Sequence, residues 1–267
     1  MRKMSFFLIC TILILITPLK NCPKAFPFEA FFGSISDNTE LNWYYGKITK
    51  NQPPEGPKES ISFLNENSAY FLGDTSNKEL YLTFDEGYEN GYTSSILDTL
   101  KELNVPAAFF VVKPYIISEP DLILRMKEEG HLVCNHSSHH PSMASITNIS
   151  SFNNEILDVE DAYKSLTGDD MPKYFRPPMG KYSVSSLERT KSLGYKTIFW
   201  SFAYKDWVVN SQPGKSDAIN KIIKSAHPGG IILLHAVSKT NSEILKEVLI
   251  QLINDGYEFK SLDSLPS

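Results

Sequence analysis

The chain has 267 residues, of which 42% are hydrophobic, so it can form one large hydrophobic core or two small ones. Its formal net charge of -5 argues against a general nucleic-acid-binding protein, which would normally carry a basic face. The same charge does not exclude a neutral or zwitterionic carbohydrate polymer as the binding partner.

Residues 1–22 predict a signal peptide or signal anchor. Arg2 and Lys3 make the first residues positively charged, and residues 5–19 form an almost unbroken apolar stretch. That stretch is short for a membrane span and has the length of a secretory signal. Because no clean cleavage site follows, an uncleaved segment that anchors the protein in a membrane is an alternative. We therefore expect a secreted protein or one anchored outside the cytoplasm.

Residues 23–76 predict an N-terminal extension. This part is rich in Pro, Asn, Ser and aromatic residues, and it shows little periodicity. The sequence Gln-Pro-Pro-Glu-Gly-Pro at 52–57 indicates an extended surface arm. Three aromatic residues just before the arm need burial: Trp43, Tyr44 and Tyr45. We therefore expect the extension to pack on the main domain, residues 77–267.

The main domain alternates between predicted strands and helices. Strands are predicted at 79–84, 106–112, 131–134, 173–176, 195–201, 229–234 and 257–260. Helices are predicted at 92–103, 119–129, 151–166, 183–193, 215–226 and 240–254, with Ser183 and Thr240 as possible caps. Hydrophobic strands that are each followed by a helix indicate a parallel sheet with a covered outer face. The expected fold class is α/β, a distorted (β/α) barrel of about seven parallel strands.

Polar residues follow five of the predicted strands. The carboxyl ends of parallel strands are where α/β folds place their active sites. Each cluster alone also fits an ordinary surface pair, a turn or a buried histidine. Five clusters at five strand ends predict a functional site, and their members are Asp85, Glu86, His136, His140, Arg176, Asp206 and His235.

A carboxylate and two imidazoles make a suitable set of ligands for a divalent metal ion. His136 and His140 are four residues apart, which allows both rings to reach one ion if the backbone brings them together. His139 is the competing ring. One of the neighbouring acids Asp85 and Glu86 would complete the set, and the other would be free to act as a base.

The order of these motifs resembles the polysaccharide deacetylase family, with its NodB-type catalytic domain. The resemblance covers residues 80–262. The motifs are Thr83-Phe84-Asp85-Glu86-Gly87, His136-Ser137-Ser138-His139-His140, Arg176-Pro177-Pro178-Met179-Gly180, Asp206-Trp207 and Leu233-Leu234-His235. A closer similarity is to sporulation deacetylases that act on N-acetylmuramic acid and lead to the δ-lactam of spore cortex peptidoglycan. Residues 43–44, 52–54, 87–93 and 227–238 carry this second similarity.

The resemblance implies roles for the acidic and basic residues. Asp85 would be the general base, with Arg176 holding it ionised. Glu86, His136 and His140 would bind one divalent metal ion, for which zinc is expected from the ligand types.

The resemblance also implies the remaining roles. His235 would protonate the leaving amine, and Asp206 would set its tautomer and pKa. The backbone N–H of Met179 would stabilise the oxyanion, Trp207 would form a wall of the acetyl pocket, and Leu233 would contribute to substrate binding.

Three residues depart from the family pattern. Glu86 stands where the family usually has Asp and where the sporulation group has Asn. Ala203 stands where the family has a further Asp, and Met179 replaces an aromatic residue.

The implied function is a secreted, metal-dependent de-N-acetylase that acts on N-acetylmuramic acid in peptidoglycan glycan strands. One alternative is a deacetylase for N-acetylglucosamine residues in peptidoglycan or a chitin-type polymer. A second alternative is a catalytically inactive glycan-binding wall protein, for which Glu86 and Ala203 are the support. No nucleic-acid partner is expected.

Overall fold

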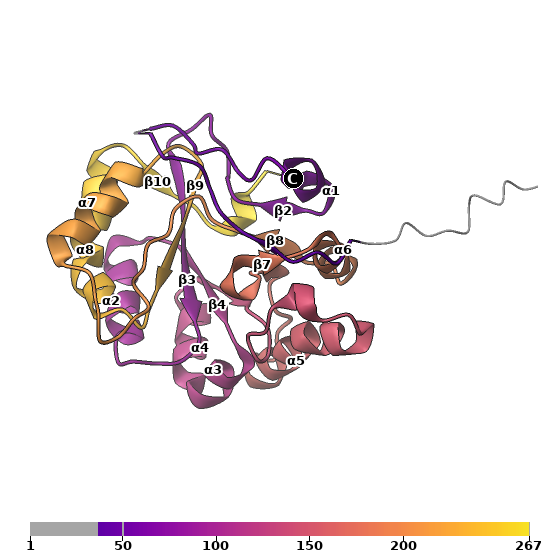
Figure 1. Cartoon of the computed structure of the whole chain (residues 1–267). Helices are drawn as coiled ribbons and strands as arrows, with labels where there is room; N and C mark the ends of the chain where they lie inside the picture. Colours follow the sequence, from indigo (N-terminus) through magenta and orange to yellow (C-terminus); the bar gives the residue numbers. More distant parts are fainter. Residues whose placement is uncertain (1–36, 50, 267) are drawn as a thin grey trace, which may run out of the picture. The chain divides into compact units, whose positions relative to one another are not determined.

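The computed structural model describes residues 37–49 and 51–266, so the predicted signal segment at 1–22 lies outside the described residues. A parallel sheet of eight strands forms the centre of the described chain (Figure 1). Its main path in spatial order is β10 (Glu258–Phe259), β3 (Glu79–Glu86), β4 (Ala107–Val111), β5 (Leu132–Asn135), β6 (Tyr174–Phe175), β8 (Lys196–Ile198) and β2 (Ala69–Tyr70). The eighth strand, β9 (Gly230–His235), pairs with β3.

All seven predicted strands are present, and the predicted parallel barrel-like architecture is confirmed. Two isolated bridges also connect β9 to the other side of the sheet, one from Ile232 to Phe202 and one from Gly230 to Leu72. The sheet therefore curves so that β9 lies between β3 and the segments that follow β8 and β2. The curvature brings the carboxyl ends of the strands around one shared region.

The six predicted helices are all present within about two residues of their predicted ends. They are α2 (Thr93–Leu103), α4 (Pro120–Glu128), α5 (Ile149–Thr167), α6 (Val184–Ser192), α7 (Lys215–Ser225) and α8 (Lys239–Asn254). Two helices of six residues, α1 (Ile61–Glu66) and α3 (Lys113–Ser118), were not predicted. They are too short to show a helical period in the sequence. None of the helices in the described part of the chain is long and apolar enough to cross a membrane.

The predicted helix caps have different outcomes. Ser183 caps α6 in a reciprocal pair with Ser186, as predicted. The prediction for Thr240 is wrong, because the Ser238 hydroxyl accepts the N–H of Asn241 and α8 begins at Lys239. The Thr240 hydroxyl instead donates to the carbonyl of Pro213, at 2.9 Å.

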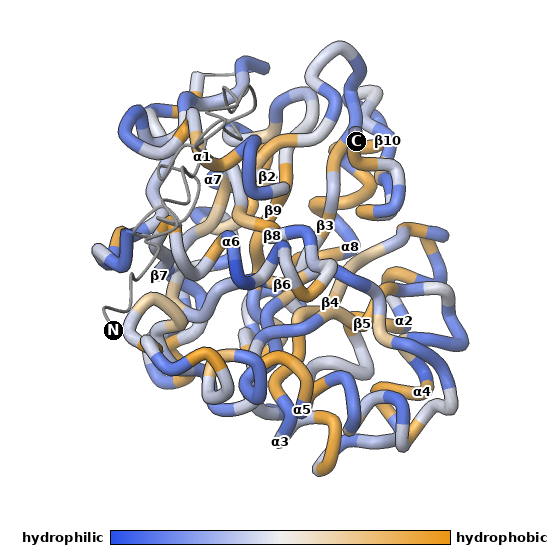
Figure 2. The backbone as a smooth tube through the Cα atoms, turned by 90° about the vertical axis from the view of Figure 1, so that its right-hand side faces the viewer, coloured by the Kyte–Doolittle hydropathy of each residue, from blue (hydrophilic) through white to orange (hydrophobic). Residues whose placement is uncertain are grey.

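The hydrophobic core lies between the sheet and the helices. Figure 2 shows hydrophobic and hydrophilic stretches alternating along the outer helices, as expected for helices with one buried face. Leu97 and Leu100 of α2 are fully buried. On the adjacent strands β3 and β4, the rings of Phe84 and Phe109 stack with their centroids 5.1 Å apart. This packing fixes β3 and β4, and with them the position of Asp85.

The described part of the N-terminal extension packs on the domain that follows. Strand β1 (Leu41–Asn42) pairs with β7 (Lys181–Tyr182), and β2 extends the central sheet. The Trp43 ring stacks on Phe199 at 4.3 Å, and its indole N–H donates to the carbonyl of Trp200. Residues 37–76 thus contribute to the sheet and the core, while the domain boundaries at 23 and 76 stay predictions.

Candidate active site

The carboxyl ends of β3 and β9 and the loops that follow β5, β6 and β8 surround a cavity of about 830 Å³. Seven of the ten predicted site residues line it: Asp85, His136, His140, Met179, Trp207, Leu233 and His235. Arg176 and Asp206 are fully buried behind it, each bonded to a residue that lines the cavity. Glu86 is the one predicted site residue that neither lines the cavity nor bonds to a residue that does.

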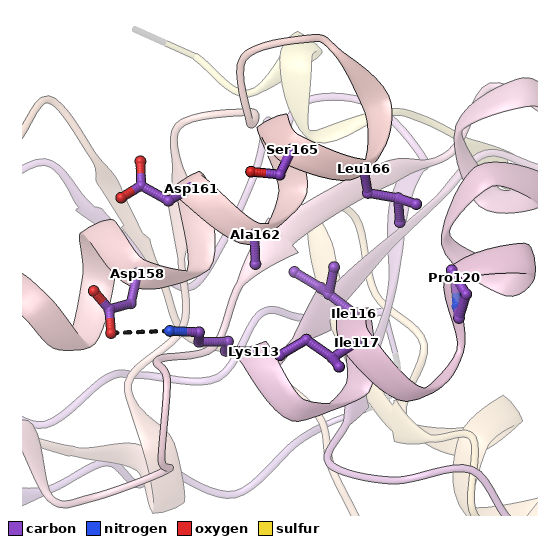
Figure 3. A pocket seen from close by; sticks show the side chains of 9 residues that line it. All are labelled: Lys113, Ile116, Ile117, Pro120, Asp158, Asp161, Ala162, Ser165 and Leu166. Carbon is purple, nitrogen blue, oxygen red and sulfur yellow. Dashed lines mark hydrogen bonds and ion pairs between the residues drawn. The ribbon is translucent and has the colours of Figure 1, made fainter.

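A second cavity, of about 470 Å³, lies between α3 and α5 (Figure 3). Apolar side chains such as Ile116, Ile117 and Leu166 line much of it, and one ion pair joins Lys113 Nζ to Asp158 Oδ2 at 3.1 Å. No histidine or cysteine lines this cavity, none of the predicted site residues does, and its lysine is paired with one of its two aspartates. The first cavity is therefore the candidate active site.

A buried ion pair holds the predicted base. Arg176 Nη1 donates to Asp85 Oδ1 at 2.8 Å, and both side chains are almost completely enclosed. Burial alone would raise the pKa of the Asp85 carboxyl, but the charge of Arg176 outweighs it and holds that pKa below its usual value. Asp85 is therefore ionised at neutral pH, with Oδ2 free of the arginine.

The two predicted metal-binding histidines lie beside Asp85. The ring centroids of His136 and His140 are 4.9 Å apart, and His136 Nε2 is 3.5 Å from Asp85 Oδ2. His136 Nδ1 lies 2.8 Å from the carbonyl oxygen of Arg176, which can only accept, so Nδ1 carries the proton and Nε2 the lone pair. Burial lowers the pKa of His136 to about 4, so its ring is neutral near pH 7. A neutral imidazole fixed by its other nitrogen suits a metal ligand.

The backbone of the second motif separates His140 from His139. Ser137 and His140 both adopt left-handed conformations, with φ of 70° and 59°. The Ser137 hydroxyl accepts the N–H of His140, which holds the turn. His139 is directed instead to Glu155, where its Nδ1 lies 2.8 Å from the carboxylate. His140, not His139, therefore lies with His136 in the cavity.

The position of Glu86 differs from that of Asp85. Strand β3 continues through Glu86, and successive side chains of a strand point to opposite faces. The Glu86 side chain is fully buried, and neither of its oxygens has a hydrogen-bond partner among the described residues. Burial, followed by the charges of Glu89 and Asp85, raises its pKa well above the usual value.

The cavity offers two imidazoles and the Asp85 carboxylate to a divalent cation. This combination of donors suits zinc, and the fixed tautomer of His136 agrees with it. Among the described residues no three His, Cys, Asp or Glu side chains are close enough to count as a preformed metal site. Glu86 as the third ligand stays a prediction that would require its side chain to turn toward the rings.

The predicted acid, His235, is held by a second carboxylate. Asp206 Oδ1 lies 2.7 Å from His235 Nδ1, and Asp206 Oδ2 accepts the backbone N–H of the same residue at 2.9 Å. Burial alone would lower the pKa of His235, but the hydrogen bond and charge of Asp206 outweigh it, and the pKa is raised. With Nδ1 bonded to Asp206, Nε2 is the nitrogen available to the cavity.

Two further residues hold this region and were not predicted from the sequence. The Asn241 side chain donates to Asp206 Oδ2 at 2.6 Å and to the carbonyl of His235 at 3.1 Å. The Tyr45 hydroxyl donates to the carbonyl of Ala203 and accepts its N–H. In the sequence, Asn241 is one asparagine of a predicted helix and Tyr45 is one of three consecutive aromatic residues. Neither pattern identifies a bonding partner.

Aromatic and apolar side chains surround the mouth of the cavity. Tyr44, Tyr88, Met179 and Trp207 are each about half exposed, and the Trp207 ring lies 5.3 Å from that of His235. Met179 has a φ of 59°, and Trp43 fixes the next residue by donating its backbone N–H to the carbonyl of Gly180 at 2.7 Å. Aromatic faces beside polar groups suit a carbohydrate ligand.

The Asp206–His235 contact leads to a prediction about pKa. In Asp206→Asn the imidazolium loses its negative partner while burial still disfavours it, so we expect the pKa of His235 to fall below its wild-type value. Titration of the His235 ring by NMR measures this shift. Glu155→Gln, which changes the partner of the exposed His139, is the matched control and should leave His235 unaffected. An unchanged or higher pKa of His235 in Asp206→Asn would contradict the assignment.

The sequence is similar to known proteins over most of its length. Residues 72–198 match the polysaccharide deacetylase family. The chain is 47% identical over 241 residues to an uncharacterized 30.6 kDa protein of Geobacillus stearothermophilus, which covers 89% of this chain and 91% of that protein. It is 43% identical over 228 residues to the peptidoglycan-N-acetylmuramic acid deacetylase PdaA of Bacillus subtilis, covering 85% of this chain and 86% of the relative.

The solved structure of the Bacillus subtilis protein, described as a family 4 carbohydrate esterase, has the same fold. It matches with a TM-score of 0.83, over 86% of this chain and 97% of that chain.

Proposed function

The chain belongs to the polysaccharide deacetylase family, and we propose that it removes the acetyl group from N-acetylmuramic acid residues in peptidoglycan glycan strands. Family membership makes it a carbohydrate N-deacetylase, a hydrolase of amide bonds. The 43% identity to an N-acetylmuramic acid deacetylase, over 85% of the chain, is the observation that carries the choice of sugar. The arrangement of Asp85, Arg176, Asp206 and His235 supports an active enzyme over an inactive glycan-binding protein.

Asp85 is the proposed general base. Amide hydrolysis requires a water molecule that loses a proton as its oxygen attacks the acetyl carbon. Arg176 occupies Asp85 Oδ1, so Oδ2 is the oxygen that can accept the proton. The low pKa of Asp85 keeps this carboxylate ionised, and its contact with Arg176 fixes its direction.

His235 is the proposed general acid. The amine can leave only as the C–N bond breaks and a proton reaches its nitrogen, and His235 Nε2 would supply that proton. The raised pKa of His235 favours the protonated form that this step needs, and Asp206 stabilises the imidazolium. Acetate, with one oxygen from the water, and the free amine are then the products.

We also propose one divalent metal ion, with zinc expected from the types of ligand. His136 and His140 would hold it together with a carboxylate. When bound, such an ion polarises the acetyl carbonyl and favours ionisation of the attacking water. The neutral His136 ring, oriented by the carbonyl of Arg176, supports this assignment.

The proposed place of action is outside the cytoplasm, in the cell wall or between the membranes around a forming spore. The support is the charged and apolar segment at residues 1–22, which would direct export or anchor the protein in a membrane. There the free amine of a muramic acid residue could close onto its lactyl carboxyl group, with loss of one water, to give a δ-lactam. A stem peptide on that carboxyl group would block closure.

The assignment of base and acid predicts large losses of rate. Asp85→Asn and His235→Ala should each lower kcat by about 10²- to 10⁴-fold, the usual contribution of general acid or base assistance. Asp206→Asn should lower kcat less and move the alkaline limb of the pH–rate profile to lower pH, because it lowers the pKa of His235. Steady-state kinetics on folded protein, checked by circular dichroism, measures these effects. A near-normal rate for Asp85→Asn would remove Asp85 from the role of base.

The metal assignment predicts a difference between neighbouring histidines. His136→Ala and His140→Ala should lose most of the tightly bound metal, because each removes one ligand, whereas the matched variant His139→Ala should keep it. Elemental analysis of the purified proteins by mass spectrometry measures the content. Glu86→Gln removes the charge of the predicted third ligand, so its metal content should also fall below that of wild type. Full metal content in both His136→Ala and His140→Ala would show that the ion binds elsewhere.

The substrate assignment predicts a defined product. Glycan strands stripped of stem peptide should lose one acetyl group from each muramic acid residue attacked, and a further water wherever the lactam closes. Mass spectrometry of the glycan fragments measures both changes, with strands that retain their peptides and chitin oligomers as controls. Deacetylation restricted to N-acetylglucosamine residues would contradict the assignment and favour a glucosamine deacetylase.

A further inference from the structure

The charged side chains that line the active-site cavity are few. Asp85 is the one Asp or Glu among the described residues that line it, and Lys205 is the one Lys or Arg. Asp85 is already paired with Arg176 at 2.8 Å. The Lys205 side chain is exposed, and among the described residues it forms no ion pair or hydrogen bond. The cavity therefore presents one cation without a partner.

The backbone on both sides of Lys205 is fixed. Two residues before it, Ala203 bonds through its N–H and its carbonyl to the Tyr45 hydroxyl, at 3.1 and 2.9 Å. Directly after it, the buried Asp206 bonds to both His235 and Asn241. Lys205 therefore extends from a held position next to the residue that orients the proposed acid.

Because the protein carries a net negative charge, an anionic ligand needs a local positive charge at its binding site. The formal net charge is -5, so the field of the whole molecule disfavours the approach of a polyanion. A glycan strand stripped of stem peptide carries one carboxylate on each muramic acid residue. An unpaired ammonium group in the cavity offsets this repulsion at the place where the sugar must bind.

We propose that Lys205 binds the lactyl carboxylate of the muramic acid residue whose acetyl group is removed. This inference rests on the proposed function and adds the group that recognises the sugar. The lactyl ether stands on the ring carbon next to the one that bears the acetamide. Lys205 and His235 line the same cavity, and Lys205 directly precedes Asp206, so the carboxylate can meet the cation when the acetamide lies at the proposed acid.

The same contact distinguishes three kinds of substrate. N-acetylglucosamine has a hydroxyl group in place of the lactyl ether, so it offers no anion to Lys205. A muramic acid residue with its stem peptide has a neutral amide there. The carboxylate is free only after the peptide has been removed, so Lys205 would favour the peptide-free strand.

A pair of matched glycans tests this inference. One is the peptide-free strand with free lactyl carboxylates, and the other is the same strand with each carboxylate converted to its methylamide. Wild type should show a higher kcat/KM on the carboxylate strand by about 5-fold, the effect of roughly 1 kcal/mol for a partly exposed ion pair. The difference should lie in KM and should decrease as salt is added.

Variants of Lys205 assign the effect to this side chain. Lys205→Gln should lower kcat/KM on the carboxylate strand by about the same factor and leave the methylamide strand unchanged, while Lys205→Arg should restore the preference. Lys221→Gln, at an exposed position of α7 that does not line the cavity, is the control and should behave as wild type.

The outcomes separate this inference from the proposed function. Equal rates of wild type on the two muramic acid strands would overturn the role of Lys205 while leaving the muramic acid assignment intact. A carboxylate preference that survives in Lys205→Gln would assign recognition to another group. Release of acetate from chitin oligomers alone, with neither muramic acid strand attacked, would overturn both.

Discussion

The buried pair of Arg176 and Asp85 is the interaction on which the rest of the active site depends. A buried ion pair is stable only when its remaining donors and acceptors are also bonded. Here Arg176 donates Nε to the carbonyl of Ile198 at 3.1 Å, and its guanidinium lies over the Phe110 ring at 4.1 Å. Its own backbone carbonyl orients the His136 ring. One residue therefore fixes the ionisation of the base, the tautomer of a metal ligand and the end of β8. Loss of either charge would leave the other buried and unpaired, at a cost of about 3–5 kcal/mol.

The parallel sheet brings the catalytic groups together because they stand at or just after the carboxyl ends of its strands. Residues at the carboxyl ends of neighbouring parallel strands meet at one edge of the sheet. In this protein Asp85 of β3 is in direct register with His235 of β9, so the proposed base and acid occupy adjacent strands. Asp206 and Asn241 then approach His235 from the loop after β8 and from α8. Because each group stands on or beside a packed element, the geometry is established before substrate binds.

The sequence predicted the strand ends well and the direction of individual side chains less well. Periodicity and motif order identified every long strand and helix and nine residues that line or adjoin the cavity. The predicted strand ended at Phe84, which left both acids in the turn, whereas β3 continues through Glu86 and alternation separates them. The contacts of Tyr45 with Ala203 and of Asn241 with Asp206 join residues far apart in the chain. A single sequence contains no signal for such pairs, because tertiary packing alone decides them.

The replacement at Ala203 connects the N-terminal extension with the charge of the active site. The family pattern has a further aspartate at this position, two residues before Lys205. Here the uncharged Tyr45 hydroxyl holds both backbone groups of Ala203, so the loop is fixed without a carboxylate. An aspartate so close to Lys205 would attract its ammonium group and reduce its charge toward a ligand. The extension thus contributes more than packing, because its Tyr45 hydroxyl holds the loop that carries Lys205. Among the described residues that lysine has no partner, and the residue after it, Asp206, orients the proposed acid.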